Sequence, residues 1–188
     1  MAKFTKTNTD VSQFLELPGK FHFVVEEINE NAMTKNNTLY NGIEIHLSIV
    51  GGTESTQLKK SFRAKISAPN LSHRDGGEFA TKVNLRLARA MGILPPAADG
   101  EEVEFDWQDG IGKQIVAFVK RTDEEDGKSY LNIDGAHIYH PHDEEVKDVP
   151  KHPDLLKACP KLNDSGKTTV NGTARKPVAA GSVDPNDL

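Results

Sequence analysis

Basic side chains and a hydroxyl alternate with mainly apolar residues over positions 58–66 of this chain of 188 residues. The alternation predicts an extended strand in which Lys59, Ser61, Arg63 and Lys65 share one face. A row of cations on a strand face can follow the phosphates of a nucleic-acid backbone. The alternative is an ordinary solvated face, whose charges discourage pairing with the edge of another sheet.

The charges of the chain are unevenly distributed. The formal net charge is −5, yet residues 55–98 hold eight basic and two acidic residues, and residues 99–134 hold four basic and eleven acidic ones. Salt screens charges beyond about 8 Å at physiological ionic strength, so a local basic patch can attract phosphates on an acidic protein. The distribution therefore leaves an anionic ligand open, in spite of the net charge.

Binding of single strands also requires flat side chains on which bases can stack. Tyr40 and Tyr130 each lie beside a turn and are the stacking candidates, whereas Phe62 and Trp107 are more typical of a core. Two further lysines beside turns complete the candidate site. The full candidate set is Lys35, Tyr40, Lys59, Arg63, Lys65, Lys113 and Tyr130.

Other residues that could do chemistry do not form a recognisable motif. His137, His140 and His142 could ligate a metal, but a solvated strand end is the favoured interpretation. The acidic run 123–126 lacks the spacing of a calcium loop and is typical of a hairpin tip. Residues 165–169 (SGKTT) resemble the end of a phosphate-binding loop but lack its first glycine. No nucleophile–base motif occurs, so we expect no enzyme, cofactor or metal site.

The periodicity of the apolar residues predicts three strands, one helix and then two more strands, in that order. The helix, expected over 79–91, ends at Gly92 and has Asp75 and Glu78 in the positions of a capping box. Its outer side carries three cations, for which a solvated helix face is favoured over binding: Lys82, Arg86 and Arg89. The strands are expected at Lys20–Ile28, Ile43–Ile49, Leu58–Ile66 and Ile115–Lys120, and Val103–Trp107 alternates as well. Tyr130–Ile133 and Ala136–Tyr139 are expected to form one final strand or a pair of short strands around Gly135.

This layout resembles that of small phage-type single-stranded-DNA-binding proteins and their uncharacterised bacterial relatives, which have an OB fold. The resemblance covers Leu17–His140 and includes the opening Leu17-Pro18-Gly19, the helix end Leu87–Gly92 and the stretch Trp107–Val119 (WQDGIGKQIVAFV). It implies a mainly β protein with a five-stranded antiparallel OB-like barrel and one helix between strands 3 and 4.

Composition completes these expectations. Residues 1–14 are expected to form a flexible arm, 15–142 the barrel, and 143–188 a disordered tail that could contact protein partners. The lone Cys159 excludes an internal disulfide, and the lack of an apolar leader or membrane span predicts a cytoplasmic protein. We expect sequence-independent binding of single-stranded DNA. The alternatives are a non-enzymatic protein-interaction scaffold and a barrel that binds a small ligand or carbohydrate.

Overall fold

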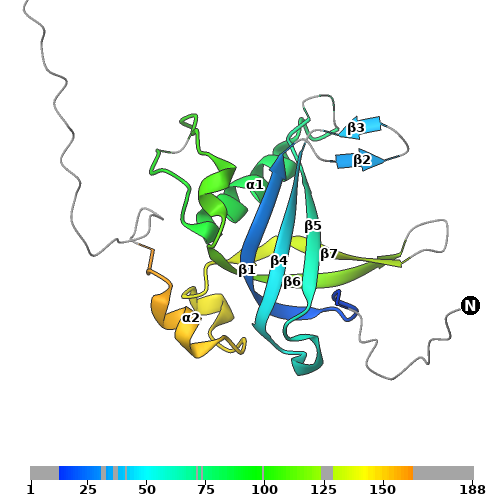
Figure 1. Cartoon of the computed structure of the whole chain (residues 1–188). Coiled ribbons are helices and arrows are strands. Elements are labelled where there is room, and N and C mark those ends of the chain that lie inside the picture. Colours follow the sequence, from blue (N-terminus) through cyan, green and yellow to red (C-terminus); the bar gives the residue numbers. More distant parts are fainter. Residues whose placement is uncertain are drawn as a thin grey trace, which may run out of the picture.

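The computed structural model describes residues 13–30, 33–35, 38–40, 42–70, 72, 74–98, 100–123 and 129–162, without the side chains of 33–35 and 38–40. Its centre is an antiparallel five-stranded sheet in the order β5-β4-β1-β6-β7 (Figure 1). The strands of this sheet are β1 (Gly19–Glu30), β4 (Gly42–Gly52), β5 (Ser61–Ser67), β6 (Gln114–Asp123) and β7 (Ser129–Tyr139). A separate two-stranded ladder joins β2 (Met33–Lys35) to β3 (Thr38–Tyr40). The prediction of a mainly β chain with one main helix is confirmed.

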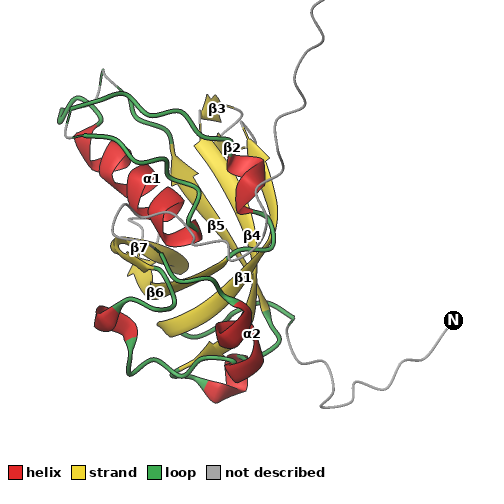
Figure 2. Ribbon diagram, turned by 90° about the vertical axis from the view of Figure 1, so that its left-hand side faces the viewer, coloured by secondary structure: helices red, strands yellow, loops and turns green. Residues whose placement is uncertain are grey.

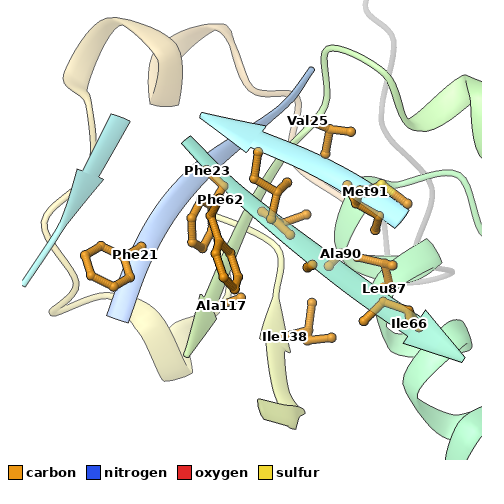
Figure 3. Packing of buried hydrophobic residues seen from close by; sticks show 14 of the residues in the cluster. Phe21, Phe23, Val25, Phe62, Ile66, Leu87, Ala90, Met91, Ala117 and Ile138 are labelled. Carbon is orange, nitrogen blue, oxygen red and sulfur yellow. The ribbon is translucent and has the colours of Figure 1, made fainter. Parts of the chain in front are cut away.

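The core lies between the inner face of this sheet and one helix, α1 (Glu78–Met91) (Figures 2 and 3). On β4 the predicted alternation holds, and Ile43, Ile45, Leu47 and Ile49 are all buried. Burial of a side chain of this size contributes about 1.5–3 kcal/mol. The strictest alternation in the sequence therefore belongs to a strand that lies next to the centre of the sheet.

Helix α1 crosses the inner face and contacts β5, β6 and β7. Its contact with β7 is close, because a Cβ on Gly135 would lie 2.5 Å from a methyl carbon of Val83. The helix ends at Gly92 in a left-handed conformation, as predicted. At its start Asp75 accepts hydrogen bonds from the amides of Gly77 and Phe79, although Gly77 is the capping residue. No helix in the described ranges is both long enough and apolar enough to cross a membrane.

Part of the expected N-terminal arm belongs to the fold. Ser61 donates its amide to the carbonyl of Gln13 (2.7 Å) and accepts from the amide of Leu15 (2.9 Å). The buried Lys60 ammonium contacts the Glu16 carboxylate at 2.6 Å. The arm prediction is therefore wrong for residues 13 and 14, and residues 1–12 lie outside the described part of the chain.

The strand suggested by the alternation of Val103–Trp107 is absent, and a 3₁₀ turn at Trp107–Gly110 follows an irregular segment. The backbone of Val25 on β1 exchanges its hydrogen bonds with Gly112 and Lys113, which directly precede β6. Trp107 instead packs at the margin of the core, with the Phe105 ring 4.9 Å away at 89°. Alternation over five residues without a ladder partner does not make a strand.

The expected disordered tail is wrong for residues 143–162. This segment contains a 3₁₀ turn at Glu144–Val146 and the short helix α2 (Pro153–Ala158), which lie together apart from α1 in Figure 1. Val146 and Val149 are buried against Val116, which projects from the opposite face of β6 to the main core. Sequence periodicity does not reveal such a segment, because its backbone is mostly irregular. Its few buried apolar residues therefore do not recur at a helix or strand spacing. Residues 163–188 lie outside the described part of the chain.

Candidate nucleic-acid interface

The outer face of β1, β4 and β5 carries the two predicted cations that lie on a strand of the main sheet. Cross-strand pairing places Arg63 opposite His46 and Lys65 opposite Glu44. Phe62, Ala64 and Ile66 point into the core, so Arg63 and Lys65 are exposed on the other side. Because side chains alternate along a strand, the two cations share one face at a spacing of two residues. The predicted common face of Arg63 and Lys65 is confirmed.

Acidic side chains lie among these cations. The His46 imidazole contacts the Glu27 carboxylate on β1 at 3.0 Å and the Glu44 carboxylate on its own strand at 3.1 Å. Lys65 lies 4.0 Å from the second oxygen of Glu44, whereas Arg63 makes no ion pair with any described residue. The face is therefore of mixed charge, and Arg63 is its most available cation.

Lys59 is not part of the row. β5 begins only at Ser61, and Lys59 lies in the preceding turn with φ of +67°, a left-handed conformation that is uncommon outside glycine. Its amide donates to the Ile49 carbonyl at 2.9 Å. The turn also reverses the expected pattern before β5, since Gln57 is buried and Leu58 is 40% exposed. The prediction that Lys59 lies on the strand face is wrong, although its side chain is exposed.

The remaining candidates lie elsewhere. Lys113 is half-buried at the entry to β6, where its carbonyl accepts from the amide of Val25. Tyr130 is 43% exposed at the start of β7, opposite Thr122. Neither residue belongs to the outer face of β4 and β5. Lys35 and Tyr40 occupy the β2–β3 ladder, and their side chains lie outside the description.

The three helix cations have structural partners. Lys82 is paired with Glu78 one turn earlier, and Arg86 donates to the Gly135 carbonyl on β7 at 3.1 Å. Arg89 forms a bidentate ion pair with Asp143, with hydrogen bonds of 2.7 and 3.2 Å. These bonds raise the pKa of the Arg89 guanidinium. The contacts of Arg86 and Arg89 bind α1 to β7 and to the C-terminal segment, so the structural interpretation of these cations is the better one.

A cluster of rings on β6 and β7 was not anticipated. Phe118 and His137 stack with centroids 5.0 Å apart and an interplanar angle of 7°, and Tyr139 lies 5.8 Å from Phe118. The Lys20 ammonium lies 4.6 Å from the centre of the Phe118 ring. The spacing of His137 and Tyr139 places them on one strand face, which is a signal that the sequence contained.

Two of the histidines are buried rather than solvated. Burial lowers the pKa of His140 to about 4 and that of His22, on β1, also to about 4. His140 lies 3.5 Å from the thiol of Cys159, whose pKa burial raises to about 11. Across the ranges that the structure describes, no three His, Cys, Asp or Glu residues are grouped to hold a metal ion. The prediction of a solvated histidine cluster is therefore wrong at His140, which joins β7 to the C-terminal segment.

A scan against protein-family models finds no match to this chain, and a search of curated proteins finds none either.

Proposed function

We propose that this chain binds single-stranded nucleic acid, most readily single-stranded DNA, on an OB-type barrel. The observation that carries the proposal is the strand order of the main sheet. Its strands in chain order are β1, β4, β5, β6 and β7, with β1 central and α1 between the third and the fourth. The OB fold has five strands in a partly open barrel and binds oligonucleotides across its second and third strands.

The second and third strands of this sheet are β4 and β5, whose outer face carries Arg63 and Lys65. In the OB fold the loops after the first and the fourth strands flank the ligand. Here the first of these connections holds β2 and β3, with Lys35 and Tyr40, and the second joins β6 to β7 just before Tyr130. Four of the candidate residues therefore lie on this face or in the first of these connections, and Tyr130 lies directly after the second.

The chemistry of the face suits a backbone ligand better than a specific base sequence. Arg63 and Lys65 supply positive charge for two phosphates. Ser61, two residues before Arg63 on β5, pairs with Ser48 on β4. Glu27 and Glu44 reduce the positive potential, so affinity should be moderate and sensitive to salt.

Fluorescence titration of a labelled oligo-dT at two salt concentrations tests the proposal. The full chain should bind dT more tightly than duplex DNA, and binding should weaken as salt rises. The double variant Arg63→Ala/Lys65→Ala should bind more weakly and lower the log–log salt slope by roughly 1.4, since each phosphate contact on a single strand contributes about 0.7.

The matched control is Lys147→Ala/Lys157→Ala. It removes the same charge from two exposed side chains of the C-terminal segment. Its affinity and salt slope should stay close to those of the unmodified protein. A folded protein that shows no binding to dT at low salt contradicts the proposal and favours a protein-interaction scaffold.

A further inference from the structure

The imidazole of His46 bridges two carboxylates on the outer face of the sheet. Its Nδ1 lies 3.0 Å from Glu27 Oε2, and its Nε2 lies 3.1 Å from Glu44 Oε1. A neutral imidazole has one N–H and one lone pair, and a carboxylate only accepts. Both contacts can be hydrogen bonds at the same time only when both nitrogens carry a proton.

The groups that surround His46 come from three strands. β1 contributes Glu27, β4 contributes Glu44, and β5 contributes Arg63 directly opposite and Lys65 next to Glu44. β2 also contacts β4, but the structure does not describe its side chains. With a protonated His46 the described group has one positive charge in excess, and with a neutral His46 its charges cancel.

Loss of the His46 proton also changes the partners of the neighbouring carboxylates. One carboxylate would then face a ring nitrogen that cannot donate. Glu44 already has a second oxygen 4.0 Å from Lys65 and can move closer to it. A Lys65 held by Glu44 is less available to a phosphate.

We propose that His46 is a positioning residue that makes anion binding on this face depend on pH. The protonated ring holds Glu27 and Glu44 and leaves Arg63 and Lys65 available to the phosphates of single-stranded DNA. The neutral ring releases the carboxylates, and binding weakens. This inference rests on the proposed function.

The test measures dT affinity at about pH 6 and pH 8, on either side of the ordinary titration range of histidine. The unmodified protein should bind about two- to fivefold more tightly at the lower pH, as expected for one exposed charge interaction. His46→Gln should bind equally at both pH values, at the weaker level. His46→Lys, with a permanent charge, should bind equally at both and at the tighter level.

His137→Gln is the matched control, because His137 is an exposed histidine of β7 that is paired with Asp134. It should keep the pH dependence of the unmodified protein. Glu44→Gln tests the role of the carboxylates directly. Its removal of one negative charge beside Lys65 should tighten binding at pH 8. Circular dichroism at each pH verifies that every variant is folded.

The outcomes separate the two proposals. Absence of binding by the unmodified protein at both pH values removes the proposed function itself. If the unmodified protein binds and His46→Gln retains the full pH dependence, the function stands and the role of His46 is wrong. Nitrogen-15 spectra of the imidazoles give an independent reading, since they show at each pH whether both nitrogens of His46 carry a proton; an unchanged state at both pH values contradicts the role of His46.

Discussion

His22 and Gln114 are joined by a hydrogen bond of 2.9 Å between adjacent strands, although His22 is fully buried. The opposite ring nitrogen of His22 accepts from the amide of His152 at 3.2 Å, and Gln114 donates to the Leu155 carbonyl at 2.9 Å. These bonds fix the tautomer of His22 with its proton on Nε2. Through this pair the outer face of β1 and β6 holds the segment that leads into α2.

Replacement of His22 should therefore release the C-terminal segment. His22→Leu preserves an apolar body but leaves the Gln114 oxygen and the His152 amide without their partner. A buried polar group left unsatisfied costs about 1–3 kcal/mol, and we expect a loss of this size in the free energy of unfolding. Urea denaturation measures it, with His137→Leu as the exposed control. An equal loss in both variants would contradict the role of the buried bonds.

Stability should fall as the pH drops below the ordinary pKa of histidine. His22 and His140 have folded-state pKa values of about 4, because burial disfavours their charged forms. Between about 6.5 and 4 the unfolded chain binds more protons than the folded one, so each pH unit lost destabilises the fold by up to about 1.4 kcal/mol per histidine. Denaturant titrations from pH 7.5 to 4.5 test this. His140→Asn should flatten the profile by about half of its slope.

Truncation separates the C-terminal segment from the rest of the tail. A chain of residues 1–142 loses Val146 and Val149 and exposes Val116 on β6. Each buried valine contributes roughly 1.5 kcal/mol or more, and the entropy cost of ordering the segment offsets part of this gain, so this chain should be measurably less stable than residues 1–162. Thermal or chemical denaturation of the two chains gives the comparison. Equal stabilities would show that residues 143–162 do not contribute to the fold.

A methyl group at Gly51, on β4, should displace the same segment. An added Cβ would lie 2.5 Å from the Pro150 carbonyl and 3.0 Å from the Lys151 Cα, and both are backbone atoms. Overpacking of this kind costs about 1–3 kcal/mol. In Gly51→Ala, hydrogen exchange should become faster in residues 146–159 and remain unchanged in β5. Uniform acceleration in both regions would contradict a local effect.

The thiol of Cys159 should report when the segment opens. Burial raises its pKa to about 11, so little reactive thiolate exists at neutral pH. A thiol reagent at pH 8 should modify the native protein much more slowly than the unfolded protein. Arg89→Ala, which removes the ion pair to Asp143, should accelerate the reaction, whereas Lys82→Ala should not. The same rate in the native protein and in Arg89→Ala would contradict a role of the ion pair in keeping the segment closed.

The sequence predicted those parts of the fold that have a regular period. β4 could be assigned from Ile43 to Ile49 alone, and the end of α1 from Gly92, because a buried face and a left-handed cap each leave a local signature. Val103–Trp107 shows the limit of this reasoning. Its alternation is as regular, but it belongs to no ladder of the described sheets, and a sequence pattern contains no information about whether a ladder partner is available.

The candidate site could be predicted only where strand geometry decides. The common face of Arg63 and Lys65 follows from alternation, whereas the left-handed turn at Lys59 depends on its bond to Ile49. Glu44 lies two residues before His46 on the same strand, but the Glu27 carboxylate reaches His46 through the pairing of β1 with β4, which includes a register shift between Val25 and Glu27. A contact that depends on such a shift cannot be read from residue spacing.

Residues 13–16 lie against the start of β5, which is an edge strand of the main sheet. An exposed edge strand is a template on which other chains can polymerise. The first residue of β5, Ser61, has its amide and carbonyl bonded to Gln13 and Leu15 of the same chain, and the Glu16–Lys60 ion pair lies beside these bonds. Residues 13–16 therefore cover the start of this edge and occupy the backbone groups to which another chain could bind. A protein that lacks residues 13–16 should be more prone to self-association through β5.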